Sequence, residues 1–175
     1  MEVTLQPITH HNWRAALSLT LPPEQQRFVA DYVPVVLIGL AKAYVGALGL
    51  TWLPYGIFAG ENLVGFVALA YPPANQHECW IFHFFIDQQS QGKGIGKRAL
   101  QAIIELVRTA FPDCRTVRLT VHPENTIAQA LYTKAGFTST GEQAFDEPLY
   151  QLAYMTGAFQ FYALKKDLVD SGKMT

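Results

Sequence analysis

The sequence has few charged residues, only two cysteines and no basic cluster. Charged residues make up 15% of the 175 positions, and the formal net charge is −1. A nucleic-acid binder needs a concentrated positive surface, whereas the longest basic runs here are the pairs Lys97-Arg98 and Lys165-Lys166, so nucleic acid is not expected as a partner. Cys79 and Cys114 lie far apart and have no cysteine or histidine at metal-ligand spacing, so no metal site is predicted.

Two further absences bear on location. The first residues, Met-Glu-Val-Thr-Leu, contain neither the basic nor the apolar segment of a secretory signal. The most apolar region, residues 33–60, is interrupted by prolines and glycines, whereas a membrane-spanning helix needs about 20 continuous apolar residues. We therefore expect reduced cysteines, a cytoplasmic location and no membrane partner.

What the sequence does have is enough hydrophobic material for a core. Half of the residues are hydrophobic and 13% are aromatic, which excludes intrinsic disorder and predicts one domain over residues 1–175. Hydrophobic spacing predicts strands at 3–5, 55–59, 63–71, 80–86, 117–121, from 137 onward and at 159–164. It predicts helices from 13, at 25–47 with a break near Pro34, at 95–111 and at 125–135, and a loop or helical excursion at 146–156. This order describes a mixed α/β (α+β) domain.

A glycine-containing loop, Gln91-Gly92-Lys93-Gly94-Ile95-Gly96-Lys97, joins a predicted buried strand to a strongly amphipathic helix. Its glycines let backbone N–H groups turn toward an anion, and the helix N-terminus adds partial positive charge, so a phosphate or pyrophosphate would fit. The alternative is an ordinary strand-to-helix turn with solvated lysines. The loop is not a Walker loop, because the gap from Gly92 to Gly96 is one residue short, and it is not a dinucleotide fingerprint, because Lys97 replaces the third glycine.

Two motifs resemble those of the GNAT acetyltransferases. Gln91, Gly94 and Gly96 occupy the defining positions of the family's pyrophosphate loop, Q/R-x-x-G-x-G/A. Downstream, Asn125 and the segment Ala130–Phe137 resemble the family's N…A-L-Y-x-x-x-G-F. The resemblance covers residues 3–165 and is closest to the branch that acetylates spermidine and spermine. It implies the GNAT acyl-CoA N-acyltransferase fold, whose central, mostly antiparallel sheet has splayed strands 4 and 5 and is flanked by helices.

The resemblance also implies a site for acetyl-CoA as acetyl donor, with no metal. The backbone of Phe84, Phe85 and Ile86 would pair with the pantetheine arm. The pyrophosphate would be held by Gln91, Gly92, Lys93, Gly94, Ile95, Gly96 and Lys97. Asn125 would bind a pantetheine amide, although it also suits a helix N-cap. Tyr132, about two helical turns after Asn125, would protonate the leaving thiolate; the alternative is an ordinary core tyrosine.

The general base is not assigned. Several relatives carry a glutamate five residues before the motif asparagine, and this sequence has Thr120 there. Glu78, His83, His122 and an ordered water are the alternatives. The histidine at position 83 stands in an apolar strand, where a partnered core histidine is an equally good interpretation.

The function implied by the resemblance is direct acetyl transfer to a primary amine of a small molecule, with polyamines as the leading class. The alternatives are a protein N-terminus, an amino acid, an antibiotic amine, or a non-catalytic module that binds acyl-CoA. Five acidic residues are expected to flank the acceptor groove and hold a cation jointly: Glu24, Asp31, Glu142, Asp146 and Glu147. The low charge content is consistent with a homodimer that buries apolar surface.

Overall fold

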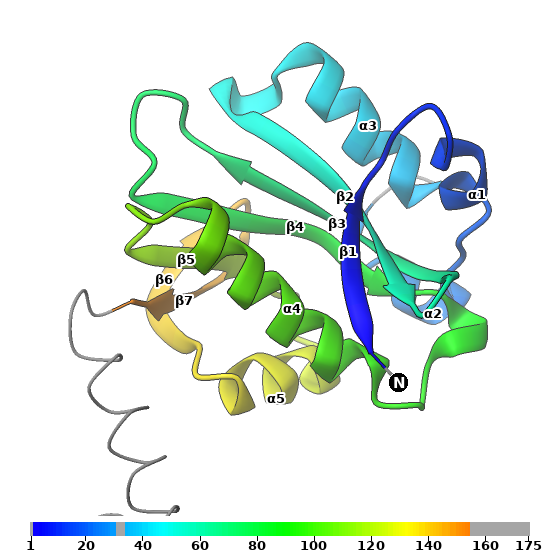
Figure 1. Cartoon of the computed structure of the whole chain (residues 1–175). Coiled ribbons are helices and arrows are strands. Elements are labelled where there is room, and N and C mark those ends of the chain that lie inside the picture. The colour runs from blue at the N-terminus through cyan, green and yellow to red at the C-terminus, as the bar shows by residue number, and fades with distance from the viewer. Residues whose placement is uncertain (1, 31–33, 155–175) are drawn as a thin grey trace, which may run out of the picture.

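Seven strands form one continuous sheet, in the order β1-β2-β3-β4-β5-β7-β6 (Figure 1). The computed structural model describes residues 2–30 and 34–154. The strands are β1 (Val3–Pro7), β2 (Thr51–Ala59), β3 (Asn62–Tyr71), β4 (Glu78–Ile86), β5 (Thr116–Thr120), β6 (Thr138–Ala144) and β7 (Glu147–Ala153). Neighbouring strands are antiparallel except for β4 and β5, which are parallel. The predicted mixed, mostly antiparallel α/β architecture is confirmed.

Helices cover both faces of this sheet (Figure 1). They are α1 (Trp13–Leu17), α2 (Pro23–Gln26), α3 (Val35–Val45), α4 (Ile95–Ala110) and α5 (Thr126–Lys134), with short 3-10 helices η1 (Ala47–Gly49) and η2 (Gln88–Ser90). One core, which includes Leu100 and Ile103, lies between the sheet and α4 and α5. A second core, which includes Val36 and Phe66, lies under α1 and α3. Within residues 2–30 and 34–154, no helix is long and apolar enough to cross a membrane.

The parallel strands β4 and β5 pair at one end and then separate. Their register is Glu78↔Thr116, Cys79↔Val117 and Trp80↔Arg118. In the adjacent β3–β4 ladder, the register shifts between Phe66 and Ala68, and His83 adopts a φ of +52°. This is a bulge, which bends a strand and interrupts its regular pairing. The predicted splay of these two strands is confirmed, and beyond Trp80 it leaves the β5-facing edge of β4 open.

The C-terminal part of the prediction needs one correction. Residues 146–156 were expected to form a loop or a helical excursion, but Glu147–Ala153 form β7, which lies between β5 and β6. Pro148 interrupts the strand pattern in the sequence, yet its carbonyl accepts a hydrogen bond from the Val121 N–H at 3.2 Å. Neighbours on both sides therefore stabilise a strand that local sequence does not indicate. The strand expected at 159–164 lies outside the described residues.

Candidate active site where the parallel strands separate

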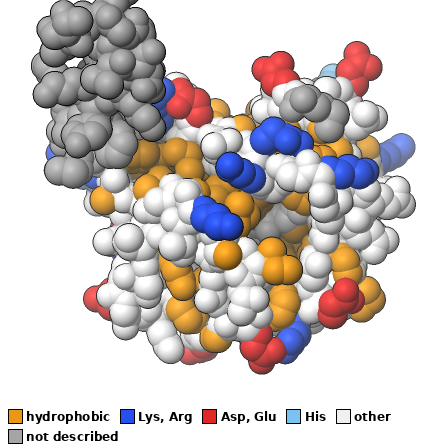
Figure 2. All heavy atoms as spheres, turned by 90° about the horizontal axis from the view of Figure 1, so that it is seen from below, with side chains coloured by type: hydrophobic (Ala, Val, Ile, Leu, Met, Phe, Trp, Pro, Cys, Tyr) orange, Lys and Arg blue, Asp and Glu red, His pale blue; other side chains and the backbone are white. Residues whose placement is uncertain are grey.

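A cavity of about 520 Å³ opens where β4 and β5 diverge. Its wall includes nearly all of the residues predicted to bind the cofactor: Phe84, Phe85, Ile86, Gln91, Gly92, Gly94, Ile95, Gly96, Lys97 and Asn125. Figure 2 shows a hollow on this side of the molecule, with hydrophobic side chains around it and Lys and Arg side chains next to it. The splayed strands thus bring residues from the middle and the end of the chain into one apolar cleft with a polar end.

The open edge of β4 supplies backbone groups to this cavity. The Asp87 N–H donates to the Val64 carbonyl of β3 at 2.9 Å, whereas the Ile86 carbonyl accepts from Gln91 Nε2 at 3.0 Å. Because backbone groups alternate in direction along a strand, Phe84 and Ile86 face away from β3. Their backbone is therefore in position to pair with an extended amide-containing chain lying in the cleft.

The glycine loop ends at the N-terminus of α4 in a conformation suited to an anion. Gly92 and Gly94 have φ values of +76° and +68°, in the left-handed region that favours glycine. Gly94 is the N-cap residue, and no side chain caps the helix. The first N–H groups of α4 therefore lack an intrahelical acceptor and carry the positive end of the helix dipole. This arrangement can bind a phosphate or pyrophosphate.

The side chain of Gln91 has a bracing role that the sequence did not indicate. Its amide forms a reciprocal pair with the amide of Gln25 from α2, with N···O distances of 2.9 and 3.1 Å. Gln91 Nε2 also donates to the Ile86 carbonyl. These bonds join α2, the end of β4 and the glycine loop, so the motif glutamine fixes the shape of the loop and leaves anion binding to backbone groups.

The basic residues of the loop differ in their placement. Lys97 lines the cavity, whereas Lys93, also predicted to bind the cofactor, does not. Lys93 is exposed, and its Nζ instead donates to the Gln89 carbonyl at 2.9 Å. The guanidinium of Arg98 donates to the Lys93 carbonyl at 2.9 Å and so holds the turn closed. Of the three cations, Lys97 is the one in position to face an anion in the cleft.

Asn125 and Tyr132, the two residues of the second motif, lie on the same cavity wall. Asn125 Oδ1 accepts from the Ala128 N–H at 3.1 Å, so the predicted N-cap is confirmed. Tyr132 is 7% exposed, and its hydroxyl forms no hydrogen bond with the residues that the structure describes. Burial, and to a smaller extent the charge of Glu147, raise the pKa of the Tyr132 phenol, so it is protonated at neutral pH. A buried, protonated phenol without a protein partner can donate a proton.

A second cavity of about 540 Å³ adjoins the first on the other side of the β4 bulge. Its residues of note are Arg27, Lys42, Phe82, His83, Thr120, Phe145 and Glu147. Both cavities share part of their walls: Phe28, Val29, Phe84, Asn125, Ala128 and Tyr132. The Arg27 guanidinium, in the second cavity's wall, forms an ion pair with Glu124 of the first. Two compounds bound in the two cavities would therefore meet beside Tyr132.

His83 is held as a neutral residue at the bulge. Its Nδ1 lies 3.1 Å from the Val29 carbonyl, to which it donates, and its Nε2 lies 3.1 Å from Lys42 Nζ and accepts from it. Burial, followed by the charge of Lys42, lowers the pKa of His83 to about 4, against the opposing effect of the Val29 carbonyl. Both ring nitrogens are therefore engaged. His83 positions the segment around Val29 and is a poor candidate for the base.

The other candidates for the base lie elsewhere. Glu78 pairs with Arg118 at 3.3 Å at the closed end of β4. His122 accepts from the Glu124 N–H, and its ring packs against Phe28. Neither Glu78 nor His122 lines either cavity.

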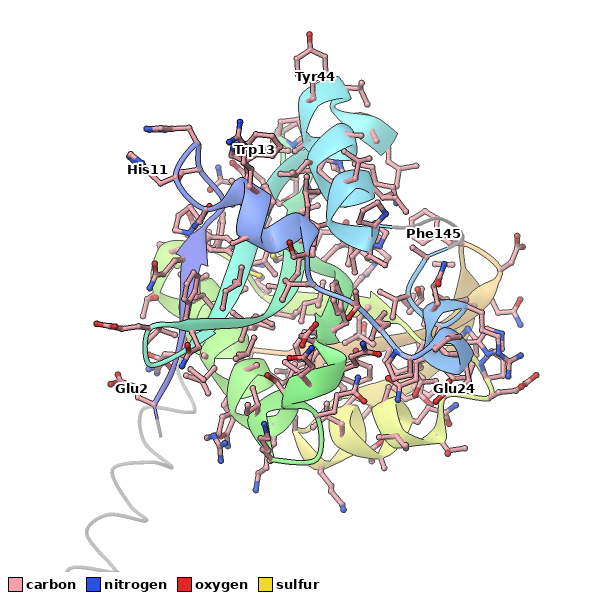
Figure 3. The ribbon with its side chains drawn as sticks, turned by 90° about the vertical axis from the view of Figure 1, so that its right-hand side faces the viewer. Glu2, His11, Trp13, Glu24, Tyr44 and Phe145 are labelled. Carbon is pink, nitrogen blue, oxygen red and sulfur yellow. The ribbon has the colours of Figure 1, made fainter. Side chains whose placement is uncertain are left out.

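The five acidic residues expected at the acceptor groove are not brought together. Glu147 lines the second cavity, but Glu24, Glu142 and Asp146 do not. Glu24 lies on α2, and its side chain is directed outward (Figure 3). Asp31 lies outside the described residues. In the described ranges, no group of three or more His, Cys, Asp or Glu side chains is placed to hold a metal.

The neutral state of His83 has a measurable consequence for stability. The pKa of a histidine in an unfolded chain is about 6.5, whereas that of folded His83 is about 4, so between these values the unfolded chain binds more protons. We expect this group to lower the free energy of unfolding by about 3 kcal/mol as the pH falls from 6.5 to 4. Urea unfolding across this range should show a shallower pH dependence in His83→Asn, since asparagine tolerates the positive φ. An exposed control, His10→Asn, should keep the wild-type slope.

Comparisons with known proteins agree with the fold described above. Residues 13–137 match the model of the Acetyltransferase (GNAT) family. The chain is 27% identical over 151 residues to a spermine/spermidine N(1)-acetyltransferase of Bacillus subtilis. The match covers 83% of this chain and 94% of that protein.

Two solved structures share the fold. AAC(6')-Ib in complex with paromomycin and acetyl-CoA superposes with a TM-score of 0.72 at 19% identity, over 91% of this chain and 97% of the other. Spermidine N-acetyltransferase from Vibrio cholerae, in complex with CoA and spermine, superposes with a TM-score of 0.69 at 17% identity, over 87% and 95%.

Proposed function

We propose that this chain, which belongs to the acetyltransferase (GNAT) family, transfers the acetyl group of acetyl-CoA to a primary amine of a small cationic acceptor, with polyamines as the leading class. The observation that carries the proposal is the meeting of two cavities beside Tyr132. One cavity has the shape and backbone donors for an extended amide chain that ends in a pyrophosphate. The other has room for an acceptor.

The donor lies in the first cavity. Backbone groups of Phe84 and Ile86 pair with the pantetheine amides, and the N–H groups at the start of α4, with Lys97, hold the pyrophosphate. Asn125 keeps its side-chain N–H₂ for the pantetheine, because its oxygen is used as the helix cap. The thioester then lies at the bulge, next to the phenol of Tyr132.

Transfer proceeds in one active-site complex. The neutral amine attacks the thioester carbonyl carbon, and backbone N–H groups of the open strand stabilise the oxyanion that forms. As the C–S bond breaks, the Tyr132 hydroxyl donates its proton to the sulfur. The tyrosinate then takes one of the two protons on the attacking nitrogen, which leaves a neutral amide with one N–H. The acetyl group passes directly to the amine, and no covalent enzyme intermediate forms.

A cationic acceptor is supported by the second cavity and by the Bacillus subtilis relative. Glu147 supplies a carboxylate there, and Phe145, which is exposed, supplies an aromatic ring whose face attracts ammonium groups. Phe145 lies at the β6–β7 turn, where it packs edge-on to Phe82 with 5.7 Å between the ring centroids. Figure 3 shows it on the same side of the molecule as α2.

The acceptor class is tested by a panel of amines. With acetyl-CoA at saturation, we expect spermidine and spermine to give kcat/KM values at least tenfold above those of single amino acids, peptides and aminoglycosides. Raising the salt concentration from low to physiological should raise KM for the polyamine more than KM for acetyl-CoA, because screening weakens an ammonium–carboxylate attraction. Turnover confined to neutral or acidic amines would contradict the proposal.

We also propose that the protein is cytoplasmic and forms a homodimer. The dimer is supported by the low charge content and by exposed apolar side chains on α3, among them Tyr44, which projects from the molecule (Figure 3). Sedimentation equilibrium at several protein concentrations tests the dimer, and a monomer at all of them would contradict it.

A further inference from the structure

We infer that Glu147, at the start of β7, binds the reacting ammonium group of the acceptor and accepts its proton. This inference rests on the proposed function and adds to it the residue that recognises the acceptor. Glu147 was not among the candidate bases from the sequence, because residues 146–156 were not expected to form a strand of the central sheet.

The sheet register places Glu147 next to the position that lacks a base. Thr120 of β5 is opposite Leu149 of β7. Directly opposed residues in antiparallel strands project from the same face, and so does the residue two places along. Glu147 therefore shares the face of Thr120, one side-chain repeat farther toward the open end of the sheet. Both residues line the second cavity. A carboxylate from the neighbouring strand therefore lies on the cavity wall where Thr120 supplies no base.

Glu147 also shares a cavity wall with the proposed acid. It lines the same cavity as Tyr132, and its charge contributes to raising the pKa of the phenol. A carboxylate on the wall of the cavity that Tyr132 also lines can reach the end of the acceptor that reacts. A carboxylate here meets the amine that attacks the thioester.

The carboxylate of Glu147 has no partner among the residues that the structure describes, as it takes part in no hydrogen bond or ion pair there. The other titratable groups of the cavity are engaged differently. Arg27 is paired with Glu124, Lys42 donates to His83, and His83 is neutral. Lys42 also lies over the ring of Phe82, 5.8 Å from its centroid. Within this set, Glu147 is the negative group that faces the cavity.

The proton balance follows from this position. The acceptor enters as R–NH₃⁺, and one N–H proton passes to the Glu147 carboxylate, which leaves a neutral amine with its lone pair free. That amine attacks the acetyl carbon, the thiolate leaves with the proton of Tyr132, and Tyr132 recovers a proton from the amide nitrogen. Glu147 then releases its proton to water. The sum is one amide, one thiol and one proton from one ammonium ion and one thioester.

The test compares Glu147→Gln with Glu142→Gln, an exposed glutamate on β6 outside both cavities. For spermidine at about pH 7, we expect kcat/KM of Glu147→Gln to fall about 100-fold, whereas Glu142→Gln stays at the wild-type value. The Kd for acetyl-CoA, measured by calorimetry, should be unchanged in both variants. Glu147→Asp, which keeps the charge on a shorter side chain, should recover part of the loss.

The pH profile separates proton transfer from a structural effect. An alkyl ammonium has a pKa near 10, so a variant without the carboxylate must select the small fraction of free amine. For Glu147→Gln, kcat/KM should therefore rise about tenfold per pH unit between about pH 6 and pH 8, whereas the wild-type profile stays nearly flat. Parallel profiles for the two proteins, or wild-type turnover in Glu147→Gln, would overturn the assignment of Glu147 and leave acetyl transfer standing. Failure of the wild-type protein to acetylate any amine would instead overturn the proposed function.

Discussion

Replacing Tyr132 with phenylalanine is expected to lower kcat for amine acetylation by roughly 10²–10⁴-fold while leaving the Kd for acetyl-CoA nearly unchanged. The hydroxyl is the one group that the substitution removes, and the ring keeps its packing against Phe137, with 5.8 Å between the ring centroids. The phenol is buried and protonated, so its loss forces the sulfur to leave as an unprotonated thiolate. Steady-state kinetics with spermidine and calorimetry with acetyl-CoA measure the two effects separately.

Tyr71→Phe is the matched control for this change. Tyr71 ends β3 and packs against Phe111, away from both cavities, so removing its hydroxyl should leave kcat at the wild-type value. Equal turnover in Tyr132→Phe and the wild-type protein would reduce Tyr132 to a packing residue. The acid would then have to be sought in solvent or in another group.

Replacing Gly94 with valine is expected to raise the Kd for acetyl-CoA by about 100-fold or more, which corresponds to the loss of at least one or two charge-assisted hydrogen bonds. Gly94 has a φ of +68° and directly precedes α4. A β-branched residue is strongly disfavoured in that conformation, so the loop must shift and withdraw the N–H groups that would face the pyrophosphate. Calorimetric titration with acetyl-CoA measures the change.

Gly60→Val imposes the same backbone strain away from the site. Gly60 lies in the turn between β2 and β3 with a φ of +61°, and a Cβ added there would meet nothing within 4 Å. We expect this variant to lose stability, as Gly94→Val does, but to bind acetyl-CoA like the wild-type protein. Unchanged affinity in Gly94→Val would contradict the assignment of the loop to the pyrophosphate.

The proposed cofactor side of the site could be predicted from the sequence because its determinants are local. The glycines need positive φ values at fixed positions, the apolar spacing of α4 specifies its buried face, and Asn125 and Tyr132 are separated by about two turns of one helix. Each of these signals is contained in a short segment. The family motifs consist of the same residues, so local chemistry and resemblance agreed on the same cleft.

The acceptor side could not be predicted because it depends on contacts between distant segments. Lys42 and His83, for example, are 41 positions apart. Glu147 reaches the cavity through the β5–β7 register, and the proline beside it hides that strand from pattern analysis. The sequence did place Glu147 near the acceptor, but it grouped it with Glu24 and Glu142, which the fold directs elsewhere.

The most direct test is the stoichiometry of a single reaction mixture. The wild-type protein is incubated with acetyl-CoA and spermidine, and free thiol and N-acetylspermidine are quantified in the same sample. Acetyl transfer at the meeting point of the two cavities predicts equal amounts of both products, formed only when protein and amine are present together. Binding of acetyl-CoA with no acetylated product from spermidine or any other amine of the panel would contradict it.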